Sequence, residues 1–371
     1  MNKKIFIPFL LIAVFALALW NKQVNQSGDQ TWVDDQIQED LSFFSKEDLN
    51  PERISSSFYS APSSQKLMHI QIKNGKVYWE RNWEGDESFD RVTKVCKYLS
   101  IASKKGTLAN VDFLLTVEDG MITPSSTSQY LPVFAFAKKQ GVNNAILFPD
   151  PLTEIFARTR VRSIGFEKIK PKNFWSKKIE KAFWRGGTTG GQYLTDTWHQ
   201  MPRTQLSLLT QYYPDDIDAG FSVFCQVTQD AKEEMLKTLP LHHWVGHKGH
   251  LKYKYLVVAD GNTCTYPRFY LGLFSGSLVF KDQTDHYQWF YRALEPYKHY
   301  IPVQADFSDL PEKVKWAKEN DKKAKQIASN ATEFIKKNMQ SHHIYAYIEK
   351  LLENYSKLQD CDFVVLSLIH I

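Results

Sequence analysis

The chain has few cysteines, and they show no pairing pattern. Its 371 residues include only Cys96, Cys225, Cys264 and Cys361, which are widely spaced and form no C-x-x-C pair. This spacing argues against a structural zinc site. One or two disulfides would form only in an oxidising compartment. The cysteines therefore leave the choice between thiols and disulfides open.

A dense basic stripe is also absent. The 46 Lys and Arg residues stand against 41 Asp and Glu, which gives a net charge of +5. The basic residues are scattered apart from two clusters, at 168–181 and 313–325, and no recognisable nucleic-acid-binding module accompanies them. The composition therefore argues against a nucleic-acid partner. It fits weak attraction to anionic lipid or to a phosphorylated small molecule.

An uninterrupted apolar run occupies residues 5–20, directly after two lysines. The run is slightly short for a membrane-spanning helix, which needs about 20 residues, and long for the core of a signal peptide. We favour an uncleaved signal anchor at residues 1–22 over a cleaved signal. The flanking charges place the rest of the chain on the non-cytoplasmic side. The location would be the ER or Golgi lumen in a eukaryote, or the inner membrane in a bacterium.

The remaining sequence can bury sizeable cores. It is 43% hydrophobic and 14% aromatic, and its length suggests two domains. Polar residues 23–66 indicate a stem with one or two short helices. Alternating strands and helices follow, which implies a parallel sheet. We expect a hairpin around Asn74-Gly75, a helix at 89–101, strands at 111–117, 131–137 and 145–148, one helix from Asp309 with a capping box, and a last helix at 344–358.

One arginine in the second half stands apart from other cations. Residues 255–259 are apolar enough for a parallel strand covered on both faces, and a polar turn beginning at Asp260 ends the strand. Arg268 follows, as the only cation between Lys254 and Lys281. Open α/β sheets bind ligands at the carboxyl ends of their strands. Arg268 therefore either holds an anion there or pairs with a local carboxylate.

A glycine-rich loop, Arg-Gly-Gly-Thr-Thr-Gly-Gly, occupies residues 185–191. It matches neither a Walker loop, which would end in Gly-Lys-Ser/Thr, nor the dinucleotide-binding fingerprint. The loop is either a flexible surface connection or a segment whose backbone N–H groups and Arg185 approach a diphosphate or a sugar.

Six blocks in a fixed order, from about residue 111 to residue 358, resemble glycosyltransferase family 90. This family includes capsule-associated xylosyltransferases, lipopolysaccharide-modifying glycosyltransferases and protein O-glucosyltransferases. The blocks are DFLLTVEDG (112–120), FWRGGTTGG (183–191), YPDDIDAGF (213–221), KYKYLVVADGNTCTYPRFYLGLFSGSLVFK (252–281), FYRALEPYKHYIPV (290–303) and AKENDKKAKQIASNATEFIKKNM (317–339).

The resemblance implies an α/β, GT-B-like fold, with two Rossmann-like domains facing across a cleft behind the N-terminal anchor. We place these domains at 67–180, for the acceptor and the base, and at 181–343, for the donor. A C-terminal helix and tail follow at 344–371. The implied reaction is an inverting transfer of a sugar, glucose or xylose first, from a UDP-sugar to a hydroxyl of a glycan, lipopolysaccharide or protein. Neither a metal nor another cofactor is expected.

The resemblance also assigns roles to residues. Asp119 matches the catalytic base, since a carboxylate must take the proton of the attacking hydroxyl; otherwise it is a turn or cap residue. Arg268 matches the arginine at the pyrophosphate. Apart from the resemblance, Glu118 either bonds an acceptor hydroxyl or is solvated, and Trp289, in an aromatic cluster, either stacks against an acceptor sugar or belongs to the core. The donor-binding set is Arg185, Gly186, Gly187, Thr188, Asp260, Gly261, Arg268 and Ser277.

Two departures from the family pattern affect these roles. Many relatives have an arginine where this chain has Glu118. Relatives often read Arg-Gly-Ser-Arg-Thr-Ser at the glycine loop, so this chain lacks the second arginine, which weakens phosphate contact and leaves the donor's identity open. A sugar-phosphate hydrolase and a degenerate carbohydrate-binding relative stay as alternatives. A histidine cluster, His242, His243, His247 and His250, lies in a glycine-containing loop, and we expect a histidine near the donor rather than a metal site.

Overall fold

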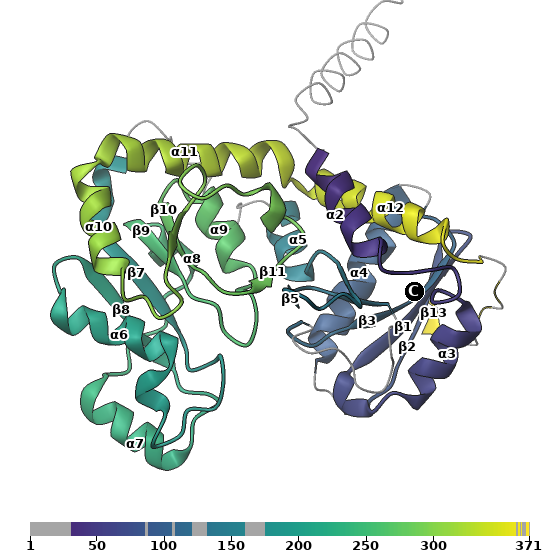
Figure 1. The fold of residues 1–371 in the computed structure, drawn as a ribbon, viewed down its shortest axis with the longest axis horizontal. Helices are drawn as coiled ribbons and strands as arrows, with labels where there is room; N and C mark the ends of the chain where they lie inside the picture. The colour runs from purple at the N-terminus through teal and green to yellow at the C-terminus, as the bar shows by residue number, and fades with distance from the viewer. Residues whose placement is uncertain are drawn as a thin grey trace, which may run out of the picture.

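The computed structural model describes residues 31–85, 88–105, 108–120, 132–159 and 175–360, together with 363, 365 and 369–370. These residues form two α/β bodies that lie side by side, each built around one main sheet (Figure 1). The predicted α/β class is confirmed. The predicted anchor at 1–22 lies outside the described residues, and no helix in the described ranges is long and apolar enough to cross a bilayer.

The sheet of the N-terminal body is mixed rather than parallel. Its order is β13-β2-β1-β3-β4-β6. Strands β3, β4 and β6 are parallel, but β1 is antiparallel to both β2 and β3. The reason is the predicted hairpin, in which Asn74 and Gly75 both have positive φ (51° and 73°) and reverse the chain in two residues. The strands are β1 (Leu67–Lys73), β2 (Lys76–Arg81), β3 (Val111–Thr116), β4 (Val133–Ala135), β6 (Ala145–Leu147) and β13 (Ile369–His370).

Helices from both ends of the sequence cover this sheet. They are α2 (Thr31–Leu41), α3 (Pro51–Ser60), α4 (Phe89–Lys105), α5 (Pro151–Thr159) and α12 (Ser341–Ser356). Trp32 and Ile37 of α2 belong to the main apolar core, and the buried Asp40 accepts a hydrogen bond from Lys138 Nζ at 2.6 Å. The described part of the predicted stem is therefore part of the folded body, because its apolar side chains find partners there.

The sheet of the C-terminal body has five strands, and all of them are parallel. Its order is β12-β10-β9-β7-β8, so the direction in which strands are added reverses between β7 and β9. Such a switch point opens a crevice at the carboxyl ends of the two strands, where open α/β sheets bind ligands. The strands are β7 (Ile179–Gly187), β8 (Ile217–Val223), β9 (Tyr253–Val258), β10 (Leu278–Asp282) and β12 (Ile301–Val303).

The two faces of this sheet belong to different apolar clusters. Tyr255 and Phe280 pack with α6 and α10 in a cluster confined to this body. Val258 and Val279 face α9, in a cluster that continues through Trp289 and α12 into the N-terminal body. The two bodies therefore share one continuous core. The helices of this body are α6 (Pro202–Tyr212), α7 (Gln229–Thr238), α8 (His247–His250), α9 (Arg268–Phe274), α10 (Leu310–Glu319) and α11 (Asp321–Asn338).

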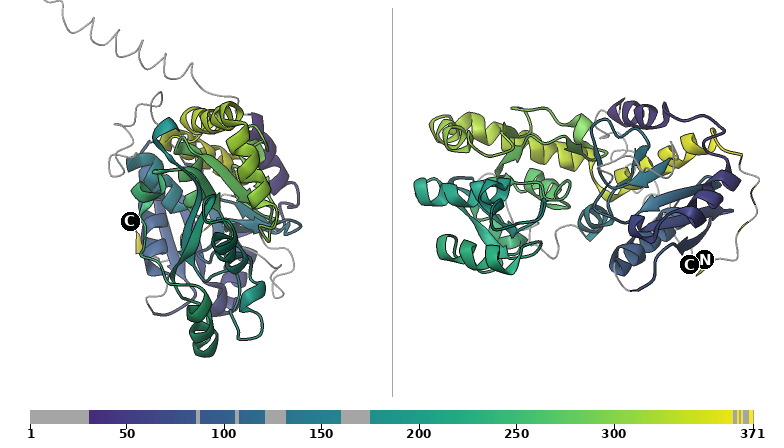
Figure 2. Two further views of the ribbon diagram at one scale, coloured as in Figure 1. Left: turned by 90° about the vertical axis from the view of Figure 1, so that its left-hand side faces the viewer. Right: turned by 60° about the horizontal axis from the view of Figure 1, so that its bottom comes forward.

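The C-terminal helices differ from the prediction in one respect. The single helix expected from Asp309 is broken at Asn320 (φ −113°, ψ 43°) into α10 and α11. No capping box forms, because the Asp309 carboxylate accepts a hydrogen bond from the Gln304 N–H instead. The chain then returns to the N-terminal body, where α12 lies against α2, α4 and α5 (Figures 1 and 2). A second link between the bodies is the pairing of β11 (His286–Tyr287) with β5 (Lys138–Lys139).

Candidate active site between the two sheets

Asp119 lies just beyond the carboxyl end of β3 and is held by an arginine from α4. Arg91 Nη2 donates to Asp119 Oδ1 at 2.5 Å, and Arg91 Nη1 donates to the Val117 carbonyl at 2.7 Å. Burial alone would raise the pKa of Asp119. The hydrogen bond and charge of Arg91, the amide of Asn262 and the charge of Lys66 outweigh it, so the pKa of Asp119 is lowered. The carboxylate is therefore ionised at neutral pH and able to accept a proton.

Three residues of the C-terminal body bond directly to Asp119. Asn262 Nδ2 donates to Asp119 Oδ2 at 3.0 Å, while the hydroxyls of Thr263 and Tyr266 donate to its carbonyl at 2.5 and 2.6 Å. Asn262 Oδ1 also accepts a hydrogen bond from the N–H of Gly190 at 3.0 Å. One side chain thus connects Asp119 with both loops at the switch point of the parallel sheet.

Arg203, in the first turn of α6, is hydrogen-bonded to both loops, the one after β7 and the one after β9. Its guanidinium donates to the carbonyls of Gly187, Ala259 and Asp260 and to the hydroxyl of Thr189. A Cβ atom at Gly261 would lie 2.5 Å from Thr189 Oγ1 and 2.9 Å from Arg203 Nη2. Only glycine fits there, so the predicted residue Gly261 serves the packing of the loops.

Arg268 begins α9, directly after the loop that follows β9. Its Nη1 donates to the carbonyl of Arg185, and no carboxylate among the described residues forms an ion pair with it. Burial, followed by the charge of Arg203, lowers the pKa of Arg268 to about 10. A buried cation without a counter-charge is costly. Of the two interpretations of Arg268, anion binding is therefore the one that the geometry favours.

The glycine loop uses its polar side chains internally. Arg185 is 8% exposed, and its Nη2 donates to Asp218 Oδ1 at 2.5 Å. The hydroxyl of Thr188, which is fully buried, bonds to the backbone of Cys225. Cβ atoms at Gly186 and Gly187 would meet the Trp184 ring and the Val223 side chain. All four predicted residues lie at the carboxyl end of β7, but the side chains of Arg185 and Thr188 are not free to contact a ligand.

Asp260 belongs to a buried charge cluster behind the loop. Lys281 Nζ donates to Asp260 Oδ2 at 2.9 Å and to Asp282 Oδ1 at 2.5 Å, and the Thr284 hydroxyl also donates to Asp260 Oδ2. Burial raises the pKa of Asp282, and Lys281 opposes this effect. Asp260 therefore holds the end of β9 in place, and its carboxylate faces Lys281 rather than an open site.

The structure does not bring Ser277 or Trp289 to the site. Ser277 directly precedes β10, at the amino end of this inner strand and not at the carboxyl ends that form the switch point, and its hydroxyl donates to the Tyr253 carbonyl. Trp289 is 1% exposed and packs against Trp32 and Tyr347 in the core. The observed contacts do not support these two assignments. Glu118 is better placed, since it adjoins Asp119, is partly exposed and pairs with Lys66 at 3.3 Å.

Two of the four clustered histidines lie next to Arg268. His247 and His250 begin and end the short helix α8 and line a pocket with Arg268. In the part of the chain that the structure describes, no group of three or more His, Cys, Asp or Glu residues could hold a metal ion. The described cysteines Cys96, Cys225 and Cys264 are free thiols.

Comparison with known proteins identifies the family. Residues 32–366 match the sequence model of glycosyl transferase family 90. The chain belongs to this family. The resemblance inferred from the six sequence blocks is thereby confirmed.

Relatives of this chain are named protein O-glucosyltransferases. Protein O-glucosyltransferase 2 of Danio rerio is 30% identical over 347 residues, which cover 92% of this chain and 65% of the relative. Protein O-glucosyltransferase 3 of Mus musculus is 36% identical, over 79% of this chain and 56% of the relative. Protein O-glucosyltransferase 1 of Homo sapiens is 29% identical, over 84% and 78%. The chain thus spans less than two thirds of the first two of these relatives.

Similarity to solved structures is weaker. Anabaena Alr3699/HepE in complex with UDP-glucose aligns with a TM-score of 0.37 and 12% identity, over 60% of this chain and 64% of that chain. A score this low carries no argument about the donor or the detailed fold.

Three residues of this family 90 site were missed in the sequence. Arg91 lies 28 positions before Asp119, and Arg203 lies between the two loops it connects, so neither adjoins a block that suggested chemistry. Asn262 was interpreted only as part of a turn. One signal in the sequence could have pointed to Arg91. Many relatives have an arginine directly before the aspartate, and this chain has Glu118 there, so a cation from elsewhere was needed beside Asp119; Arg91 of α4 is that cation.

Proposed function

We propose that this family 90 protein is an inverting glycosyltransferase of GT-B type, with Asp119 as its base. One observation carries the proposal. An ionised carboxylate at a strand end of one sheet is hydrogen-bonded to the loop that follows β9 at the switch point of the other sheet, and Arg268, which has no carboxylate partner among the described residues, begins the helix after that loop. A candidate base and a candidate anion-binding residue are therefore both linked to the loop after β9, which supports a reaction in which a hydroxyl meets an activated sugar there.

The proposed step is a single displacement. The acceptor hydroxyl attacks the anomeric carbon of a UDP-sugar, the new C–O bond forms, and the bond from the sugar to the β-phosphate oxygen breaks. Asp119 takes the hydroxyl proton. Arg268 stabilises the negative charge that develops on the diphosphate. We propose that this guanidinium performs the task for which other transferases use a metal ion, so that no cofactor is needed.

The names of the relatives favour glucose as the sugar and a protein hydroxyl as the acceptor. Xylose as the sugar, and a glycan or lipopolysaccharide as the acceptor, belong to the same proposal, because the described contacts do not distinguish among them. Attachment to the membrane through residues 1–22, and a location in the ER or Golgi lumen or at the inner membrane, stay predictions.

A panel of nucleotide sugars tests the proposal directly. Thermal-shift measurements with UDP-glucose, UDP-xylose, UDP-galactose and UDP-glucuronate should show stabilisation by at least one of them, in the presence of EDTA as well as in its absence. Incubation of that donor with acceptor should give a conjugate of inverted anomeric configuration. Free sugar without any conjugate would instead indicate a hydrolase.

A second candidate function is sugar-nucleotide binding without transfer. It is favoured by the glycine loop, where Arg185 and Thr188 are engaged with Asp218 and Cys225 rather than with open space. In that case a UDP-sugar would bind with stabilisation of the protein, yet no conjugate would form with any acceptor at any pH.

The pair formed by Arg91 and Asp119 predicts a pH effect. Because Arg91 helps to hold the pKa of Asp119 below its ordinary value, the base stays ionised, and activity persists, down to low pH. Arg91→Met removes that charge and raises the pKa, so the acidic limb of kcat/KM should move to higher pH, by about one unit. Arg91→Lys keeps the charge and should shift the limb less. An unchanged limb in Arg91→Met would show that another group titrates.

A further inference from the structure

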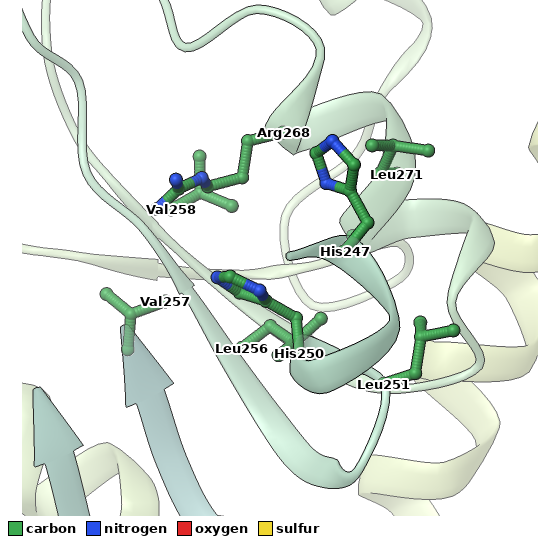
Figure 3. A pocket seen from close by; sticks show the side chains of 9 residues that line it. His247, His250, Leu251, Leu256, Val257, Val258, Arg268 and Leu271 are labelled. Carbon is green, nitrogen blue, oxygen red and sulfur yellow. The ribbon is translucent and has the colours of Figure 1, made fainter. Parts of the chain in front are cut away.

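A small pocket on the C-terminal sheet joins the buried arginine to two imidazoles. It lies between α8, α9 and β9, and its polar side chains are Arg268, His247 and His250 (Figure 3). Leucine and valine residues form most of the remaining wall. Its volume of about 20 Å³ leaves room for roughly one water molecule. A single phosphate oxygen therefore fits into it, whereas a whole nucleotide does not.

His250 has one ring nitrogen that the described residues leave without a partner. Its Nδ1 lies 3.2 Å from the carbonyl of Gly246, and since a carbonyl can only accept, Nδ1 carries the hydrogen. The Nε2 atom of the neutral ring is then a lone-pair acceptor. It is buried and has no hydrogen-bond partner among the described residues. A buried polar atom of this kind requires an explanation.

Every charged group that acts on His250 is cationic or can become so. Arg268 faces it from α9, His247 from its own helix α8, and Arg185 from β7, while the ring of Phe183 in β7 meets it edge-on at 5.0 Å. Burial, and then the charge of Arg268, lower the pKa of His250 to about 4. The imidazole is therefore neutral in the free protein. Asp218 pairs with Arg185, whereas Arg268 has no carboxylate partner among the described residues, so the charge beside the pocket matches an anion.

We propose that His250 is a proton-linked binding residue, whose Nε2 takes up a proton when a diphosphate occupies the pocket and then donates a hydrogen bond to a phosphate oxygen. The inference rests on the proposed function for its ligand, the diphosphate of a UDP-sugar or of UDP. The balance is simple. One proton moves from solvent to Nε2, Nδ1–H keeps its bond to Gly246, and no covalent bond changes. Both ring nitrogens are then satisfied, and the anion gains a second cation beside Arg268.

The direction of the pH effect follows from linkage. Bound negative charge raises the pKa of His250 from its low value in the free protein. Protons are therefore taken up between the free and the bound pKa values, and the affinity for the anion increases as pH falls through that window. UDP, whose sugar bond is broken, carries more charge than the UDP-sugar and should show the larger uptake.

Calorimetry in buffers of different ionisation enthalpy measures the uptake. We would titrate the full chain with UDP, and separately with inorganic pyrophosphate, at pH 6.5, comparing wild type with His250→Gln. The terminal phosphate of UDP titrates near this pH as well, and the variant subtracts its contribution. The wild type should take up about 0.5 to 1 proton more than His250→Gln. His243→Gln, at an exposed histidine of the same segment, should behave like wild type.

Each result separates this inference from the proposed function. UDP binding with equal proton uptake in wild type and His250→Gln overturns the inference and leaves the function standing. Pyrophosphate binding with His250-dependent uptake, but no binding of UDP, supports the inference and refutes the nucleotide donor. Binding of neither refutes both. Should His250→Gln fail to fold, histidine NMR signals of the wild type decide, because a new imidazolium signal must appear on addition of UDP.

Discussion

Asp119→Asn should reduce turnover by about 10²- to 10⁴-fold while leaving the affinity for UDP unchanged. The amide cannot accept the proton of the attacking hydroxyl, yet it has nearly the same shape as the carboxylate. Its oxygen can still accept from Arg91 or from Asn262, although its NH₂ group meets one of these two donors unfavourably. The proposed binding residue for the nucleotide, Arg268, is on the other body, so UDP affinity should be maintained.

Turnover and UDP affinity, measured together, check this expectation. Asp90→Asn is a matched control, because Asp90 lies in α4 of the same body, is largely exposed, and pairs only with Lys94. It should retain the activity of the wild type. Transfer at the wild-type rate in Asp119→Asn would refute the assignment of the base, and loss of UDP affinity together with turnover would indicate a structural role.

Arg268→Met should weaken UDP binding by about 10- to 100-fold, which corresponds to about 1.5 to 3 kcal/mol for charge-assisted hydrogen bonds. It should not lower the thermal stability of the free protein. Removing a charge for which the described residues supply no carboxylate partner relieves a cost of folding, since methionine fills a similar volume without needing a counter-ion. Opposite effects on binding and stability distinguish a ligand-binding arginine from a structural one.

Arg203→Met provides the contrasting variant. Arg203 is also buried, but its guanidinium is bonded to three carbonyls and a hydroxyl of the two loops. Its removal takes away the donor of the Asp260 carbonyl and one of the two donors of the Gly187 and Ala259 carbonyls, and it should lower the melting temperature clearly. The affinity for UDP, measured by calorimetry, and the melting temperature, measured by thermal denaturation, should be compared for both variants. A destabilised Arg268→Met with normal UDP affinity would contradict the assignment.

The sequence predicts the elements of this site better than their contacts. The strand before Asp119, the strand before Asp260 and the isolation of Arg268 are all local patterns, and each lies where it was expected. Arg91 and Asn262 act on Asp119 from distant positions in the chain. Their roles depend on how two sheets face each other, which no local pattern records.

The two assignments that the contacts do not support have the same origin. Ser277 lies in the same block as Arg268, but helix α9 separates them and carries the chain back to the amino ends of the parallel strands. Trp289 lies in an aromatic cluster that could line a cleft or fill a core, and the core is continuous here. The residue type predicts that such a ring will be buried, but it does not predict which part of the molecule will bury it.

Because α12 returns to the N-terminal body, the two bodies are expected to fold as one cooperative unit. Helices from both ends of the sequence, α2 and α12, cover one sheet, and the apolar cluster beneath them continues under α9 of the other body. A fragment cut at the predicted domain limits would expose that shared surface, so neither half is equipped to fold alone. Loss of packing anywhere along this shared cluster is therefore expected to alter both the base and the anion site, because their alignment and the cooperativity of folding depend on the same contacts.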